Sequence, residues 1–105
     1  MEKTIRPVKW TSRAVNDLEK NFRFNINIYG SEKAIEIATK IRKHTEILEN
    51  SDFKGIGSID EDFLHLKFEY RKIIYKHCKI TYRIGNEYIY INRIFDPRQN
   101  PIKNK

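Results

Sequence analysis

Two stretches in the first half of the chain carry apolar residues at helical spacing. In residues 12–29 one apolar side chain follows another every three or four positions, and the stripe consists of Val15, Leu18, Phe22, Ile26 and Tyr29. Residues 31–48 repeat the pattern with Ala34, Ala38, Ile41, Thr45 and Leu48. Gly30 separates the two stretches; a hydroxyl of Thr11 or Ser12 can cap the start of the first, and Ser31 can cap the second. We predict an antiparallel hairpin of two helices.

The apolar positions of this hairpin are the predicted core. If both stripes face the rest of the domain, their side chains are removed from water. We expect the following residues to be buried: Val15, Leu18, Phe22, Ile26, Ala38, Ile41 and Leu48.

The second half of the chain has the pattern of short strands. Aromatic and β-branched residues fill residues 63–68, 70–77, 80–84 and 88–95, and Val8–Trp10 forms a similar short segment at the start. Polar and glycine residues make a loop of Glu49–Asp62 and a turn of Gly85–Asn86. The tail from Asp96 to Pro101 contains two prolines and cannot continue a strand.

Alternation within residues 80–84 predicts a sheet with two different faces. Ile80, Tyr82 and Ile84 share one face, whereas Thr81 and Arg83 share the other. The first face belongs to the core, and the second is exposed to water. With helices first and a run of strands after them, the fold class is α+β: an N-terminal strand and a two-helix hairpin packed on one face of a mostly antiparallel sheet.

Length and composition fit one folded domain over residues 1–105. The 105 residues suffice for one core, and 39% hydrophobic content with six Phe and six Tyr exceeds that of a disordered chain. The single Cys78 cannot form an internal disulfide, so no oxidising compartment is implied. Neither a signal peptide nor a membrane-spanning segment is evident, so we expect a cytoplasmic protein without a membrane partner.

The chain is strongly basic, and several cations fall on strands. The formal net charge of +7 favours polyanions or an acidic protein partner. Cations that can meet on the open face of the sheet are Lys67, Arg71, Arg83, Arg93 and Arg98. Such a group can bind phosphates or carboxylates, although strand lysines and arginines also serve simply as solvated surface residues.

Other reactive side chains give weaker signals. His65 and His77 lie in predicted strands and can exchange a proton near neutral pH, but they also fit as half-buried structural residues. His44 is expected on the solvent side of its helix, and Cys78 as a packing residue. No metal-ligand spacing is present, and we expect neither metal nor cofactor.

Three segments give the chain a family resemblance. "VKWTSRAVNDL" opens the first helix, "HLKFEYRKIIYK" spans the middle and "INRIFDPRQNP" closes the last strand. Together they resemble the RelE/ParE superfamily of bacterial type II toxins, from about Val8 to Pro101. The resemblance implies a cognate antitoxin as partner, and either the ribosome with its messenger RNA (RelE-like) or DNA gyrase (ParE-like) as target.

The resemblance also implies roles for particular residues. In RelE-like members, arginines matching Arg71 and Arg98 stabilise the scissile phosphate, and basic residues near His65 and Lys67 assist. That branch usually carries a tyrosine shortly after the last arginine, where this chain has Gln99 to Ile102. The ending therefore favours a ParE-like gyrase inhibitor over a messenger RNA endonuclease. A third hypothesis is a non-catalytic nucleic-acid-binding module, in which Tyr88 and Tyr90 stack on bases.

Overall fold

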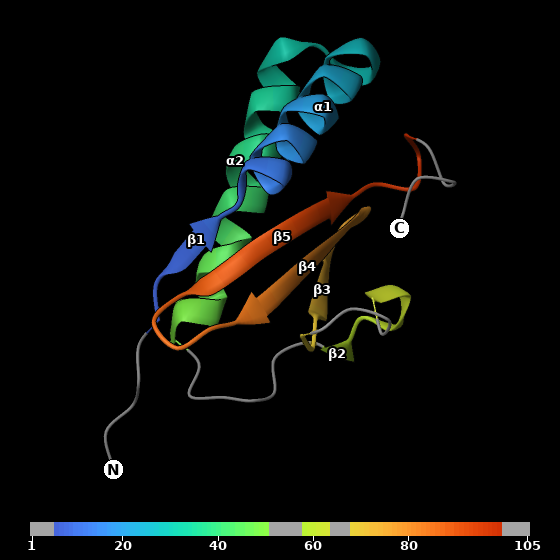
Figure 1. The fold of residues 1–105 in the computed structure, drawn as a ribbon. Helices are drawn as coiled ribbons and strands as arrows, with labels where there is room; N and C mark the ends of the chain where they lie inside the picture. The colour runs from blue at the N-terminus through green and yellow to red at the C-terminus, as the bar shows by residue number, and fades with distance from the viewer. Residues whose placement is uncertain (1–5, 51–57, 64–67, 100–105) are drawn as a thin grey trace.

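A five-stranded sheet carries a helical hairpin on one face (Figure 1). The computed structural model describes residues 6–50, 58–63 and 68–99. The elements follow in the order β1 (Val8–Trp10), α1 (Ser12–Tyr29), α2 (Ser31–Thr45), the 3-10 helix η1 (Glu46–Asn50), β2 (Ser58–Ile59), the 3-10 helix η2 (Glu61–Phe63), β3 (Arg71–Tyr75), β4 (Cys78–Ile84) and β5 (Ile89–Phe95). The predicted α+β class, N-terminal strand and helical hairpin are confirmed.

The sheet has the strand order β1-β5-β4-β3-β2. β1 runs parallel to β5, and the other neighbouring pairs are antiparallel. The connection of β1 to α1 is fixed by Thr11, whose hydroxyl oxygen accepts the Ala14 N–H at 3.2 Å and whose own hydroxyl donates to the carbonyl of Ile91 at 3.0 Å. One N-cap residue thus starts α1 and anchors it to the sheet.

Gly30 permits the sharp reversal between the helices. Its φ of +91° lies in the region that side chains disfavour, and its N–H closes α1 on the carbonyl of Ile26 at 2.9 Å. The same residue precedes α2 directly, so the connection is a single residue long. None of the described helices is long and apolar enough to cross a membrane.

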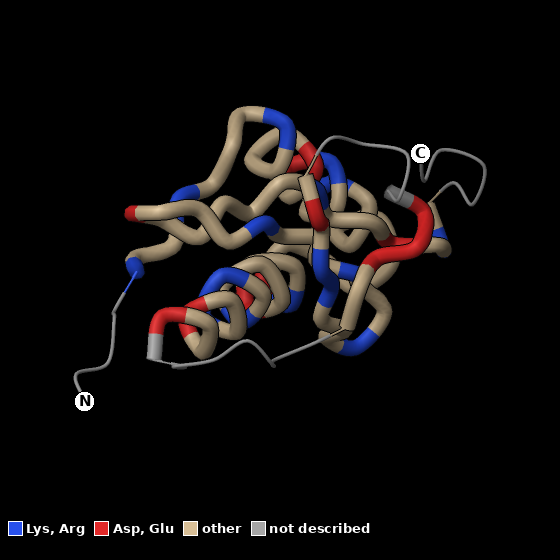
Figure 2. Tube along the Cα trace, turned by 60° about the horizontal axis from the view of Figure 1, so that its bottom comes forward, with Lys and Arg blue, Asp and Glu red and all other residues tan. Residues whose placement is uncertain are grey.

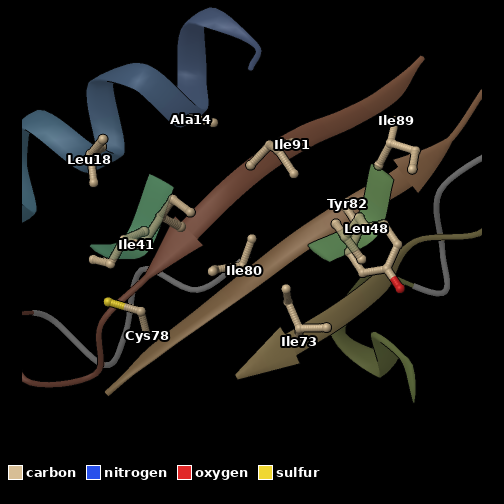
Figure 3. Packing of buried hydrophobic residues seen from close by; sticks show 11 residues of the cluster. Ala14, Leu18, Ile41, Leu48, Ile73, Cys78, Ile80, Tyr82, Ile89 and Ile91 are labelled. Carbon is tan, nitrogen blue, oxygen red and sulfur yellow. The ribbon is translucent and has the colours of Figure 1, made fainter. Parts of the chain in front are cut away.

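The core lies between the hairpin and the inner face of the sheet (Figure 3). Leu18 of α1 and Ile41 of α2 face Ile80, Ile91 and the other apolar strand residues. Leu48 of η1 covers the far end of the sheet and is fully buried. The predicted burial of Leu18, Ile41 and Leu48 is confirmed.

The stripe predicted for α1 is displaced around the helix, and the prediction for Val15 is wrong. Val15 is 45% exposed, and the buried residues of α1 are Ala14, Leu18, Asn21 and Asn25. These also recur every three or four positions, so both stripes fit a helix. The stripe with the two asparagines is the buried one because Asn21 and Asn25 form hydrogen bonds with the turn that follows β5, as described below. Phe22, Ile26 and Ala38 are only partly buried.

The prediction that the outer face of residues 80–84 is exposed to water is wrong at Thr81. Thr81, expected in water, is fully buried because its hydroxyl donates to the Asp60 carboxylate at 2.6 Å. Lys79 beside it pairs with Asp60 at 3.0 Å and with Asp62 at 2.9 Å. Thr81 and Tyr82 are neighbours in β4, so they face opposite sides of the sheet, and both are buried. The register with β5 shifts between them, since Thr81 pairs with Arg93 and Tyr82 with Ile91. The segment from β2 to η2 therefore covers this part of the sheet.

The strand predicted for residues 63–68 is not seen at its described ends. Phe63 ends η2 and Phe68 lies in a bend, while residues 64–67 lie outside the described residues. The edge strand is instead β2, within the predicted loop, because Ser58 and Ile59 pair with Lys72 and Arg71.

A pair of substitutions in α1 tests the displaced stripe. Leu18→Ala should lower the free energy of unfolding by about 2–4 kcal/mol, because it leaves a cavity against the sheet. Val15→Ala, three residues earlier, should change it by less than about 0.5 kcal/mol. Urea denaturation of both variants measures the difference. Equal losses would contradict the buried face described above.

Candidate functional site

A buried carboxylate organises the turn after β5. Asp96 is 2% exposed and accepts hydrogen bonds from the Arg98 backbone N–H at 3.0 Å and from Arg98 Nη2 at 2.7 Å. Arg98 Nε also lies 3.1 Å from Asp96 Oδ1. The short Asp-Pro-Arg turn thus folds the arginine back on the aspartate two residues before it. Both members of this ion pair therefore belong to the same turn.

Helix α1 supplies the rest of the partners. Asn21 Nδ2 donates to Asp96 at 2.9 Å, and Asn25 Nδ2 donates to Asn21 Oδ1 at 3.0 Å. Arg98 Nη2 donates to Asn25 Oδ1 at 3.1 Å, and Nη1 donates to the Tyr29 hydroxyl at 3.2 Å. We call Asn21, Asn25, Asp96 and Arg98 the α1–turn network. It connects the middle of α1 to the end of β5.

The two asparagines of this network are buried polar positions that the sequence analysis missed. Their signal was present, since Ala14, Leu18, Asn21 and Asn25 are spaced by four, three and four residues. Two amides that continue an otherwise apolar helical stripe indicate a buried polar contact. The partner, 75 residues later for Asn21, cannot be read from the spacing.

The network stabilises the charged forms of both ionic members. Burial alone would raise the pKa of Asp96, but the hydrogen bonds and charge of Arg98 outweigh it and hold that pKa below its usual range. The hydrogen bond to Asp96 raises the pKa of Arg98. Arg98 is also 5.2 Å from the ring centre of Phe24. Its guanidinium is fixed in place by α1.

A pocket of about 230 Å³ opens beside Arg98, between the helical hairpin and the β3–β4 hairpin. Its floor is apolar and includes Ile37, Ile41 and Tyr75. Its cationic lining residues are Lys33, Lys40, Lys76 and Arg98. The single carboxylate in the lining is Glu36, which pairs with Lys40 at 2.8 Å and Lys33 at 3.5 Å. We call this the hairpin pocket; its chemistry suits an anionic group attached to an apolar one.

Lys76 occupies an unfavourable backbone conformation at the rim of the hairpin pocket. Lys76 and His77 form the two-residue turn between β3 and β4, closed by the pair Tyr75 and Cys78. The φ of Lys76 is +53°, where glycine or asparagine is usual. This turn conformation places Lys76 among the residues that line the pocket.

Arg71 lies at the opposite end of the sheet from Arg98. It starts β3 opposite Tyr82, near the end of β4, whereas Arg98 follows the end of β5 that pairs with Lys79. Arg71 Nη1 contacts the Glu69 carboxylate at 3.0 Å. Burial alone would lower the pKa of Arg71, and hydrogen bonds with Glu69 and Tyr82 outweigh it, so the pKa is raised. The arginines do not meet at one site, and His65 and Lys67 lie outside the described residues.

The expected convergence of strand cations on one open face is wrong for the described residues. Arg93 makes a two-point contact with Asp17 of α1, with Nε at 2.8 Å and Nη2 at 3.2 Å. Arg98 belongs to the α1–turn network, whereas Arg83 does lie on the open face, away from the helices, and contacts aromatic rings there. Lys and Arg are spread over both helices and the strands (Figure 2).

The remaining reactive side chains have structural surroundings. His44 is half-buried against Tyr75, with ring centres 4.6 Å apart, rather than in solvent, and His77 is exposed in the turn. Cys78 belongs to the core, as predicted, and burial raises the pKa of its thiol to about 12. Such a thiol is not a nucleophile at neutral pH. Within residues 6–50, 58–63 and 68–99 no cluster of three possible metal ligands occurs.

Comparison with known proteins decides the family. The profile of the ParE toxin of the type II toxin-antitoxin system, parDE, matches residues 8–101. The chain belongs to the ParE toxin family. Its fold is also that of a solved structure titled the chromosomal ParDE TA system from P. aeruginosa, with a TM-score of 0.77 and 22% identity over 90% of this chain and 98% of that one. No curated protein sequence matches this ParE-family chain.

Removing the charge of Asp96 tests the α1–turn network. Asp96→Asn should lower the free energy of unfolding at pH 7 by about 2–3 kcal/mol, because it leaves Arg98 without its carboxylate. As a control, Glu19→Gln breaks the exposed pair of Glu19 and Arg23, and should cost less than about 1 kcal/mol.

The pH dependence gives a second readout for the same variant. Because the folded pKa of Asp96 is lowered, its ionised form stabilises the fold above the unfolded pKa of about 3.9, and this contribution is lost as pH falls through the folded pKa. The difference between wild type and Asp96→Asn should therefore shrink below about pH 4. A difference independent of pH would contradict the assignment.

Proposed function

We propose that this ParE-family toxin acts in the cytoplasm on DNA gyrase and does not cleave RNA. The family match supports a ParE-type target. The observation that carries the proposal is the position of the two candidate catalytic arginines. Phosphodiester cleavage requires cations gathered where negative charge develops. Arg71 and Arg98 belong to different pockets at opposite ends of the sheet.

The contacts of Arg98 support the same conclusion. Its guanidinium donates to Asp96, Asn25 and Tyr29. An arginine held by a buried carboxylate acts as a clamp between two elements, and moving it to a phosphate would leave Asp96 charged and buried. Arg98 therefore serves the fold in this proposal. Messenger RNA cleavage on the ribosome is the alternative that the experiment must exclude.

Two assays on one set of variants separate the targets. We expect purified toxin to block supercoiling by gyrase, and messenger RNA from expressing cells to remain intact by primer extension. Arg71→Ala should weaken gyrase inhibition by about tenfold or less, because it removes a single contact. An endonuclease that used Arg71 would lose about a hundredfold in cleavage.

Arg98→Ala is the accompanying variant, and it should lower the melting temperature because the α1–turn network is broken. Circular dichroism distinguishes this loss from a loss of activity in a folded protein. Codon-spaced cuts that vanish in a folded Arg71→Ala protein would overturn the gyrase proposal.

We also propose that a cognate antitoxin covers the hairpin pocket with an acidic segment. Support comes from the cations around the pocket, the apolar floor and the overall charge of +7. The segment inserts a carboxylate near Lys76 and Arg98 and an apolar side chain against Ile37. A helix or a strand of the antitoxin can present such a pair of side chains.

Stopped-flow association at increasing salt tests the antitoxin proposal. The on-rate should fall by about an order of magnitude between low and high ionic strength, because the attraction is long-range. Lys76→Gly relieves the positive φ, so it should fold at least as stably while lowering the on-rate. Lys20→Ala is the control, since Lys20 is an exposed lysine of α1 that does not line the hairpin pocket. Equal effects of the two variants would contradict the assigned position.

A further inference from the structure

Cations and aromatic rings alternate across three strands on the face of the sheet away from the helices. Lys9 of β1 lies directly opposite Tyr90 of β5, and Tyr90 lies directly opposite Arg83 of β4. Directly opposed residues project from the same face. Ile89 and Ile91, the neighbours of Tyr90, are buried on the helical side, so the row Lys9, Tyr90, Arg83 occupies the other face.

The side chains of this row contact further rings. The guanidinium carbon of Arg83 is 4.4 Å from the ring centre of Phe68 and 4.7 Å from that of Tyr90. Lys9 Nζ is 5.1 Å from the ring centre of Tyr88, and the Tyr88 and Tyr90 rings are 6.0 Å apart. These five residues form what we call the aromatic row. Its cations and rings hold each other in position.

Gly85 makes room for the aromatic row. A Cβ atom at this position would lie 2.8 Å from Cε2 of Tyr90 and 3.0 Å from the backbone oxygen of Tyr88. Only a residue without a side chain lets the Tyr90 ring rest on the turn. The ring position is therefore specified by the backbone on one side and by Arg83 on the other.

The aromatic row is accessible. Phe68 is 47% exposed, Lys9 is exposed, and Tyr88, Tyr90 and Arg83 are partly exposed. Two carboxylates adjoin the row along the chain: Glu69 is engaged by Arg71, and Glu87 is exposed in the turn before Tyr88. Exposed rings interleaved with cations suit a strand of unpaired bases, which stack on the rings while phosphates meet the cations. An acidic peptide would use the cations but leave the rings without a stacking partner.

We propose that the aromatic row is a binding site for single-stranded nucleic acid. Bases stack on Phe68 and the tyrosines, and the phosphates contact Lys9 and Arg83. Recognition by stacking does not depend on base sequence, because every base has an aromatic face. The site is separate from the hairpin pocket, shares none of its residues, and does not rest on the gyrase or antitoxin proposals.

Fluorescence anisotropy with a fluorescein-labelled 12-mer of deoxythymidine tests the proposal on the purified full chain. Phe68→Ala should weaken binding about tenfold, since one stacked base contributes roughly 1–3 kcal/mol. Ile74→Ala is the matched control, because Ile74 is 60% exposed on the same face but carries no ring. It should leave affinity unchanged. Thermal unfolding of both variants verifies that they are folded.

A probe without bases separates stacking from charge. An abasic 12-mer with the same number of phosphates should bind at least tenfold more weakly than the thymidine probe. Gly85→Ala, which displaces Tyr90, should weaken the thymidine probe but not the abasic one. Equal affinity for the two probes, or full displacement by a glutamate-rich peptide of equal charge, would overturn the proposal in favour of a site for any anion. Equal loss in Phe68→Ala and Ile74→Ala would also overturn it.

Discussion

The ion pair between Arg98 and the buried carboxylate of Asp96 is the contact on which the arrangement of this domain depends. A charge with 2% exposure is tolerated only if it is paired and hydrogen-bonded. The turn provides the cation, Arg98, and the amide of Asn21 in α1 donates a further hydrogen bond to the carboxylate. Helix α1 must therefore present its asparagines to the turn. This requirement rotates its buried face away from Val15 and fixes how the helix lies along β5.

The need to pair buried carboxylates also divides the cations of the chain into two groups: those held in structural ion pairs and those on the surface. Arg98 and Arg93 join α1 to β5 through carboxylates, and Lys79 fixes the η2 segment on the sheet. These charges are used in folding. Around the hairpin pocket, Lys33 and Lys40 share the exposed carboxylate of Glu36 and Lys76 is exposed, whereas Lys9 and Arg83 contact aromatic rings. A net charge of +7 thus separates into structural pairs and two surfaces of different chemistry.

The hairpin pocket and the aromatic row lie at different places on one small sheet. The inner face is apolar and is closed by the helical hairpin, so it forms the core of the domain. The outer face is closed at one end by Asp60 and Asp62, which leaves the aromatic row at the other end. The hairpin pocket lies at the edge between layers, where α2 meets the β3–β4 turn. Since a fold does not specify a function, these local sites are where members of one toxin family can differ.

The sequence by itself determined the class of fold, the two helices to within a few residues, the helical reversal at Gly30 and the family. These depend on local signals, such as apolar spacing, caps and turn residues, which act within about ten residues of the chain. It also placed Leu18, Ile41 and Cys78 in the core. It did not determine that Val15 faces water, that Thr81 is buried, or that Arg71 and Arg98 lie apart. Each of these depends on partners distant in sequence, Asp96 for Asn21 and Asp60 for Thr81, and two stripes of one helix fit the local pattern equally well. Only the tertiary structure decided between them, because a buried polar group must find its partner wherever the fold brings one within hydrogen-bond distance.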